Sequence, residues 1–313
     1  MYRASITEAQ KKCVMEDIGY DDTQMKNKIQ QVKQWMKKQP HLPQLPDEMY
    51  DIIICSFLIG TKMSTEKTKY KLDTFYAMRH QLPEIFLNID PTLKDVRDSV
   101  DKIRYFFLLE MTHDAIGINI ISFNPDKDRK CTAQDIKGLY KRITALTVFL
   151  LLNTTYNRGI YVLLDLSGLS ASHLTELNWF YMQKFTALGL EALPVRIKRI
   201  FIINAPTFFD TLYNNLFKSI LTEKMKKRIQ IVHNYNDLCK YIPKRILPVD
   251  YGGDGPTAEE SSRECQKTIE SIRDFIIEDA KRITDESKRP KESHNDCGQM
   301  FGVEGTFNKL AID

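Results

Sequence analysis

The chain has 313 residues, and its 45 lysines and arginines against 41 aspartates and glutamates give a formal net charge of +4. So small an excess does not by itself indicate a nucleic-acid partner, because nucleic-acid-binding surfaces concentrate many cations. Hydrophobic residues make up 42% of the chain and charged residues 27%, as in an ordinary soluble globular protein. The most apolar run, residues 143–152, has about half of the ~20 residues needed to cross a bilayer. We therefore expect a soluble protein that binds no nucleic acid.

The reactive side chains follow no pattern of a metal site or a disulfide framework. The six cysteines are scattered without a C-x-x-C pair, which favours reduced thiols in the cytoplasm. The six histidines lack metal-ligand spacing, so neither a metal nor a cofactor is expected. The N-terminal sequence MYRASITEAQKKC contains no apolar signal core. These features predict a cytoplasmic protein.

Residues 1–90 are predicted to form a helical lobe. Apolar residues recur at helical spacing in residues 21–38, and the prolines between positions 40 and 46 end that helix. Residues 47–59 and 64–78 predict two further helices, the second capped by Ser64 or Thr65.

Residues 91–253 alternate short apolar strands with helices. Strand-like residues 104–110 and 116–123 are separated by a polar turn and are expected to pair as neighbours. A capping box at Thr132 opens a helix that is expected to reach about Asn157. Further strands are predicted at 160–166, 200–203 and 229–232, and further helices at 172–190 and 208–221. This order indicates an α/β protein with a mostly parallel sheet covered by helices.

Residues 254–313 form the third predicted unit, which packs back on the body. Residues 257–282 predict one amphipathic helix. Residues 285–297 are polar and are expected to be loose.

The stretch 194–228 combines basic and apolar segments in an unusual order. Three basic residues lead into the apolar strand 200–203, and an N-A-P turn ends it because proline cannot continue a strand ladder. Residues 208–221, here called the gate helix, carry an apolar stripe made of Phe208, Phe209, Leu212, Tyr213, Leu216, Phe217 and Ile220. The sequence becomes basic again after Leu221. An apolar helix between two cationic clusters is what a gate facing an anionic membrane needs.

The sequence contains no pattern typical of an active site. The phosphate-binding and nucleophile motifs G-x-G-x-x-G, G-x-x-x-x-G-K-[ST] and G-x-S-x-G are all missing. Asp165 ends a buried strand, a plausible catalytic position in α/β folds, but no acid or base is paired with it nearby. We expect a structural carboxylate there, and a protein that is not an enzyme.

Short motifs follow one another in a fixed order from about Asp47 to the C-terminus: Asp165-Leu166-Ser167-Gly168, Phe201-Ile202-Ile203-Asn204-Ala205-Pro206, Leu221-Thr222-Glu223-Lys224, Leu247-Pro248 and Tyr251-Gly252-Gly253. This ordered set resembles the CRAL-TRIO (Sec14-like) lipid-transfer family. The pattern is closest to alpha-tocopherol transfer protein-like and cellular retinaldehyde-binding protein-like members, whose tails residues 305–310 also resemble. The resemblance implies a CRAL-TRIO fold, in which a mostly parallel sheet and its flanking helices enclose a hydrophobic cavity, with an N-terminal helical lobe.

Apolar side chains on the helices after residue 132 fit either a packed core or the wall of such a cavity, because periodicity alone does not separate the two. The resemblance favours the cavity. The predicted ligand pocket comprises Leu139, Ile143, Leu146, Phe149, Leu150, Ile160, Val162, Leu164, Phe180, Phe185, Leu188, Ile200 and Ile202. Tocopherol-binding relatives place small hydroxyl residues where this chain has Arg142 and Leu146, so the identity of their ligand is not transferred.

The basic residues beside the gate helix match the family's phosphoinositide-binding cluster position by position: Arg196, Lys198, Lys224 and Arg228. Lys224 and Arg228 are four residues apart and are expected to project from one helix face. Arginine binds phosphate bidentately and lysine as a point charge, so the four could converge on one headgroup.

Taken together, these patterns predict a non-enzymatic, monomeric carrier of one small hydrophobic ligand, such as a retinoid, carotenoid or tocopherol. It would load and release that ligand at phosphoinositide-containing membranes as a cytoplasmic, peripheral protein. One alternative is a lipid-responsive sensor or scaffold that presents a lipid to a partner protein or regulates it. A second is an enzyme, or a chaperone that presents lipid to one; the missing catalytic motifs argue against the enzyme.

Overall fold

The computed structural model describes residues 6–124, 131–153, 156–170, 179–214, 218 and 221–290, without the side chains of residues 179, 180 and 212. The first five helices are α1 (Glu8–Ile18), α2 (Asp22–Lys38), α3 (Asp47–Gly60), α4 (Thr65–Gln81) and α5 (Pro83–Phe86). The three helices predicted in this region are confirmed to within three residues, and Ser64 caps α4 by accepting a hydrogen bond from the Lys67 backbone N–H. Helix α1, which begins with a capping box at Thr7, lies in the predicted helical lobe but was not predicted as a separate helix.

A five-stranded sheet forms the centre of the molecule, with its strands in the order in which they follow along the chain. Helix α6 (Lys94–Lys102) leads into it, and the strands are β1 (Ile103–Phe107), β2 (Ile116–Phe123), β3 (Gly159–Asp165), β4 (Ile197–Ile203) and β5 (Ile229–Val232). Strand β1 pairs antiparallel with β2, and the other three pairings are parallel. The predicted α/β class and the pairing of the first two strands are confirmed. Strand β4 begins three residues earlier than expected.

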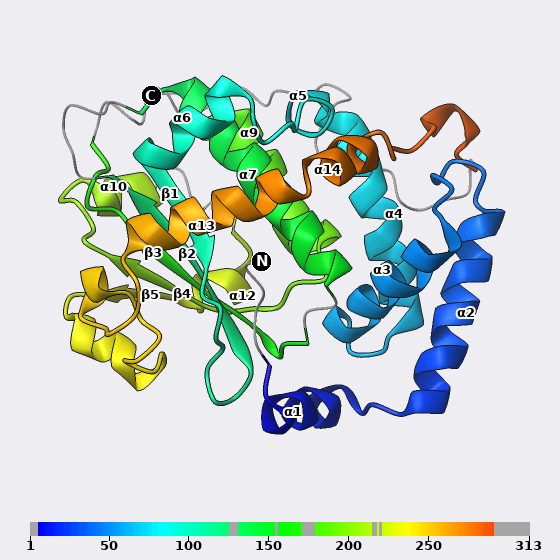
Figure 1. The fold of residues 1–313 in the computed structure, drawn as a ribbon, viewed down its shortest axis with the longest axis horizontal. Helices are drawn as coiled ribbons and strands as arrows, with labels where there is room; N and C mark the ends of the chain where they lie inside the picture. The colour runs from blue at the N-terminus through cyan, green and yellow to red at the C-terminus, as the bar shows by residue number, and fades with distance from the viewer. Residues whose placement is uncertain are drawn as a thin grey trace, which may run out of the picture.

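Helices cover the sheet. Helix α7 (Ala133–Leu152) follows β2 and opens with the predicted capping box, but it ends five residues before Asn157. It packs against β1, α3, α6 and α13 (Ala258–Ser271). Helix α9 (Trp179–Ala187) continues into the π-helical segment η1 (Leu188–Ala192) and precedes β4. Figure 1 shows α13 crossing in front of the sheet and α7 running from the sheet toward α3 and α4.

Two short helices lie in the region of the gate helix, α10 (Phe209–Leu212) and α12 (Glu223–Lys226). The 3₁₀ segments η3 (Tyr235–Lys240) and η4 (Val249–Tyr251) follow β5. The single helix predicted for 257–282 is wrong, since α13 ends at Ser271 and α14 (Arg273–Ala280) starts beyond the non-helical Ile272. Segment η5 (Glu286–Lys288) lies in the stretch expected to be loose, of which residues 291–297 are outside the description.

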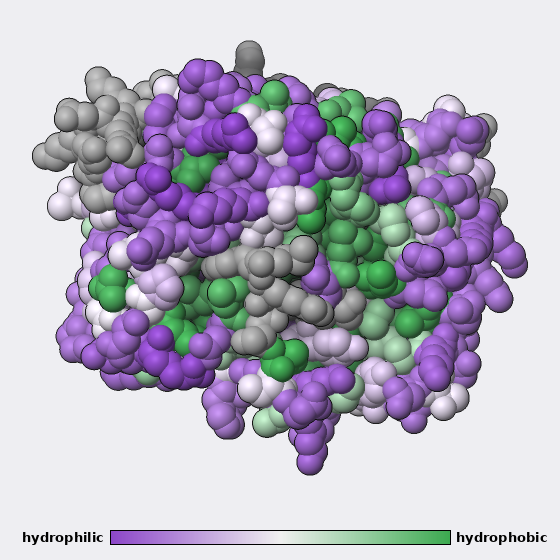
Figure 2. Space-filling model, viewed as in Figure 1, coloured by the Kyte–Doolittle hydropathy of each residue, from purple (hydrophilic) through white to green (hydrophobic). Residues whose placement is uncertain are grey.

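A continuous hydrophobic cluster runs from α1 and the helical lobe through the sheet to α13 and α14. A smaller cluster surrounds Leu166, Leu169, Ile202 and Phe209. Hydrophilic side chains cover most of the face in Figure 2, and hydrophobic ones gather in a recess beside α7. Within the described ranges, no helix has the length and apolarity to cross a bilayer, no three potential ligands are grouped around a metal position, and the five described cysteines form no disulfide.

Candidate functional site

An apolar cavity of about 350 Å³ lies between one face of the sheet and the helices α7 and α9. Alternate residues of a strand face the same side, so each strand presents a row of apolar side chains to it. The sheet contributes Ile103, Ile121, Phe123, Leu164, Ile197, Ile200, Ile202 and Ile229. The helices and loops contribute Ile136, Leu139, Tyr140, Ile143, Leu166, Leu169, Met182, Phe185, Thr186, Gly189, Leu190, Phe209, Tyr213, Leu221 and Met225.

The predicted pocket residues divide into two groups. Six of them line this cavity: Leu139, Ile143, Leu164, Phe185, Ile200 and Ile202. Leu146, Phe149 and Leu188 are buried in the main hydrophobic cluster instead. Leu150, Ile160 and Val162 are half-buried and do not line the cavity, and the side chain of Phe180 is outside the description.

Aromatic packing shapes the wall formed by α7 and α9. The rings of Tyr140 and Phe185 stack with their centroids 4.2 Å apart and their planes at 22°. Burial raises the pKa of Tyr140, so its hydroxyl stays neutral at physiological pH. Tyr140, Thr186 and Tyr213 carry the only side-chain hydroxyls among the described lining residues. The wall therefore offers a ligand much apolar surface and few polar groups.

The described part of the gate helix borders the cavity. Phe209 is 5% exposed and lies against Tyr213, with ring centroids 6.1 Å apart. Phe208 packs on the same small cluster. Met225 of α12 is also buried and lines the cavity, held by Thr222, whose hydroxyl accepts a hydrogen bond from the Met225 backbone N–H. Leu216, Phe217 and Ile220 and the side chain of Leu212 lie outside the described residues.

The four predicted headgroup residues have different surroundings. Arg196 and Lys198 lie at the start of β4, where Arg196 Nη2 donates to the Asn157 carbonyl at 3.0 Å. Lys224 is exposed on α12. Arg228 is not on a common helix face with Lys224, because α12 ends at Lys226; its guanidinium donates to the Ile197 carbonyl instead. That expectation was wrong, since the chain turns toward β5 directly after α12.

An unpredicted acidic partner lies among the basic residues. Asp17 of α1 contacts Arg196 Nη1 with Oδ2 at 2.9 Å, and Lys62 Nζ with Oδ1 at 3.0 Å. The Nη2 atom of Arg158 is 3.7 Å from the same Oδ1. Burial opposes ionisation of this carboxyl, but Lys62, Arg196 and Arg158 together outweigh it and hold the pKa of Asp17 below its usual range.

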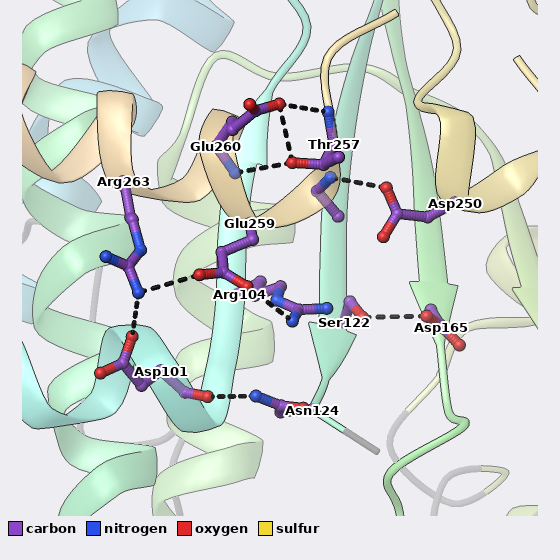
Figure 3. A network of polar contacts seen from close by, with 11 residues as sticks. Asp101, Arg104, Ser122, Asn124, Asp165, Asp250, Thr257, Glu259, Glu260 and Arg263 are labelled. Carbon is purple, nitrogen blue, oxygen red and sulfur yellow. Dashed lines mark hydrogen bonds and ion pairs between the residues drawn. The ribbon is translucent and has the colours of Figure 1, made fainter. Parts of the chain in front are cut away.

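Asp165 has a structural environment. It is 5% exposed at the C-terminal end of β3, and its carboxylate accepts hydrogen bonds from the side chains of Ser122 and Asn204 at 2.9 and 2.8 Å. The Tyr251 hydroxyl and the Ser167 backbone N–H also donate to it, at 3.2 and 3.1 Å. Figure 3 shows the contact with Ser122 beside the polar groups that fix the first turn of α13. The carboxylate thus joins β2, β3 and the segments after β4 and β5.

Two cations, the buried Arg142 and the half-buried Lys71, support the cavity walls without lining the cavity. Arg142 of α7 is 2% exposed and does not line the cavity; it donates to the Ile103 carbonyl at 2.7 Å and to Ser262 Oγ at 3.0 Å. Lys71 of α4 donates to three carbonyls at the end of η1, those of Leu190, Glu191 and Leu193, at 3.0, 3.0 and 2.9 Å. The sequence carries no signal for Lys71, because its partners are backbone atoms more than a hundred residues away.

This architecture is that of an α/β protein with an apolar space between its sheet and its covering helices. Residues 118–253 match the model of the CRAL/TRIO domain, and residues 21–96 match that of a Pinta-like UBA domain. Residues 118–253 thus match a CRAL/TRIO domain, and the resemblance drawn from the motifs is confirmed.

Among its relatives, the mouse (Mus musculus) alpha-tocopherol transfer protein-like protein is 26% identical over 257 residues, which are 80% of this chain and 71% of that protein. The human (Homo sapiens) protein of the same name is 27% identical over 72% of this chain and 64% of its own length. SEC14 cytosolic factor of Kluyveromyces lactis is 32% identical over 31% of this chain and 32% of that protein. A crystal structure of Sfh5 covers 83% of this chain and 99% of its own, with a TM-score of 0.48 and 13% identity.

Proposed function

We propose that this protein binds one small hydrophobic ligand in the apolar cavity and carries it between membranes. The observation that supports the proposal best is the cavity itself, whose volume of about 350 Å³ falls within the range of small-molecule sites. Moving apolar ligand surface out of water is worth about 25 cal/mol per Å², so the lining can bind such a molecule without a charged anchor. Binding and release complete this function, with no catalytic step.

Membrane contact is the second part of the proposal. Arg196 and Lys198 lie near the edge of the sheet where β4 begins, and Lys224 projects from α12, whose Met225 lines the cavity. Each cation near an anionic surface contributes about 1 kcal/mol to binding, so several hold the protein there reversibly. A phosphoinositide headgroup on these residues would place α12 against the lipid. The relatives' names are consistent with transfer of a lipid, and the alpha-tocopherol in them is not carried over to this chain.

The test of ligand binding compares the native protein with a cavity-blocking variant. We expect one lipophile per chain in an organic extract of protein purified from a lipid-rich host, identified by mass spectrometry and by the absorbance of the intact complex. Ile143→Trp fills the cavity from α7 and should reduce the bound lipid about tenfold, because overpacking an apolar site costs on the order of 1–3 kcal/mol. Ile52→Trp, at a position on α3 that is 36% exposed, is the control.

An extract without lipid, from a protein that also ignores offered lipids, contradicts the carrier. Equal lipid in the Ile143→Trp variant and the native chain would place the ligand elsewhere. A bound lipid that is never exchanged between vesicles, but that changes binding of a partner protein, would favour the sensor or scaffold.

A further inference from the structure

Four cations from separate parts of the chain gather around one carboxylate. Lys62 comes from the turn between α3 and α4, Arg158 directly precedes β3, Arg196 directly precedes β4, and Lys198 is the second residue of β4. These four residues are called the cationic cluster. Asp17 on the last turn of α1 contacts three of them at 2.9 to 3.7 Å. The N-terminal ends of β3 and β4 are neighbours in the sheet, which brings Arg158 close to Arg196 and Lys198.

The cationic cluster has more positive charge than Asp17 neutralises. Burial and the charge of Arg196 lower the pKa of Lys198, with Lys62 and Arg158 adding to the repulsion. The Nε atom of Arg158 is buried and has no hydrogen-bond partner. Lys62 itself has a φ of 54°, a left-handed conformation that is unfavourable for a side chain of this kind. A carboxylate carries one charge, and a phosphomonoester carries nearly two and three acceptor oxygens, so phosphate fits this cluster better.

Helix α1 packs on the rest of the protein through few apolar side chains. Only Val14 and Ile18 of its eleven residues are buried. Beyond Asp17, the side-chain amide of Gln10 donates to the Thr112 carbonyl at 2.9 Å. Figure 1 shows α1 at the lower edge of the molecule, away from the bundle of α2 to α5. Elements with few buried apolar contacts open at low free-energy cost.

We propose that Asp17 is an internal competitor for the headgroup site: α1 covers the cationic cluster when the protein is off the membrane and is displaced when a phosphoinositide binds. This inference rests on the proposed membrane function and extends its site to Lys62 and Arg158. Displacement of α1 replaces the carboxylate of Asp17 by a phosphate. Because only molecules with α1 displaced can bind the headgroup, the apparent affinity for membranes falls as the docked fraction rises. Helix α1 therefore sets how much phosphoinositide a membrane needs to recruit the protein.

The test measures cosedimentation of the full chain with phosphatidylcholine vesicles that contain phosphatidylinositol bisphosphate, and with phosphatidylserine vesicles of matched total charge. Asp17→Asn should bind the phosphoinositide vesicles at least about fivefold more tightly than the native chain, the lower end of typical coupling between sites. The matched control is Glu16→Gln, an exposed neighbour on the same helix that loses the same charge. Val14→Ala loosens α1 without a change of charge and should shift binding in the same direction.

Hydrogen exchange of residues 8–18 gives a second readout. Phosphoinositide vesicles should raise exchange there in the native chain, and Asp17→Asn should show raised exchange without vesicles. If the native chain binds and Asp17→Asn gains no more than Glu16→Gln, the competitor role is overturned and the headgroup site stands. A gain in Asp17→Asn without one in Val14→Ala would show a plain charge effect and would also overturn it. If Arg196→Gln together with Lys198→Gln leaves vesicle binding unchanged, the proposed headgroup site fails, and the competitor role fails with it.

Discussion

At the scale of single residues, Asp165 shows how one buried carboxylate can organise several chain segments. Four donors converge on it, two from side chains of neighbouring segments, one from Tyr251 and one from the Ser167 backbone. Burial and the charge of Asp165 raise the pKa of Tyr251, which keeps its hydroxyl a donor. A buried polar group that loses its partner costs about 1–3 kcal/mol. Asp165 and its four donors, here called the Asp165 hub, therefore contribute more to the stability of the fold than one hydrogen bond does.

Asp165→Ala should therefore lower the free energy of unfolding by about 3 kcal/mol, because it leaves several buried donors without an acceptor. Urea denaturation of the full chain measures the loss. Asp254→Ala, which removes an exposed carboxylate 3.6 Å from Lys244, should cost under about 1 kcal/mol. Equal losses for the two variants would show that the hub does not stabilise the fold.

Neighbouring apolar residues of α7 show why the sequence does not tell cavity-lining residues from core residues. Ile143 and Leu146 lie three residues apart on the apolar stripe of α7, yet Ile143 lines the cavity and Leu146 packs in the core. Both positions need an apolar side chain, so their residue types carry no information on which of them borders empty space. Tyr140 and Thr186 were missed for the converse reason, since polar side chains are not expected in an apolar lining.

At the scale of elements, the long helices and the strands could be predicted and the weakly anchored or interrupted elements could not. Apolar periodicity gave α2, α3 and α4 to within three residues. Helix α1 buries only two side chains and leaves no such pattern. The break at Ile272 is invisible in the sequence because no glycine or proline marks it, and the helical pattern continues beyond it. Whether such an element forms, and where it is interrupted, depends on contacts with distant parts of the chain.

Segment η1 is an element that depends on a contact of this kind. Lys71 holds three carbonyls at its C-terminal end, and Gly189 and Leu190 of the same segment line the cavity. Burial lowers the pKa of Lys71 to about 8, so the side chain is still mostly protonated at neutral pH and donates with its full ammonium group. The helical lobe thus fixes part of the cavity wall.

Lys71→Met keeps the aliphatic stem and removes the donors. We expect a loss of about 1–3 kcal/mol in the free energy of unfolding and weaker binding of the extracted lipid, since the wall at Leu190 loses its support. Lys69→Met is the control on the same helix, where the lysine pairs with the exposed Glu66 and should contribute less than about 1 kcal/mol. Unchanged stability and lipid binding in Lys71→Met would show that η1 holds its shape without the lobe.

At the scale of the whole molecule, the C-terminal helices fasten the helical lobe to the body. Figure 1 shows α14 beside α4. Arg79 of α4 is 2% exposed and contacts Asp279 of α14 twice, with Nη2 2.7 Å from Oδ2 and Nη1 2.8 Å from the carbonyl. Nearby, Arg289 lies 2.8 Å from Asp73, in the stretch that the sequence predicted to be loose. Composition indicated disorder there because it shows the charges but not their partners.

The pair of Arg79 and Asp279 allows the strength of this connection to be measured. Breaking a buried ion pair leaves one charge without its partner and costs about 3–5 kcal/mol, whereas replacing both partners costs much less. Arg79→Met should therefore lower the free energy of unfolding by about 3 kcal/mol, the low end, because Arg282 remains 3.0 Å from Asp279. The double variant Arg79→Met, Asp279→Leu should recover part of that loss.

The control is Arg263→Met, which removes an arginine that is 55% exposed in its ion pair with Glu259 and should cost under about 1 kcal/mol. Urea denaturation of these variants and of the single variant Asp279→Leu closes the double-mutant cycle. Strictly additive losses would mean that Arg79 and Asp279 stabilise the molecule independently and that their ion pair does not fasten the lobe.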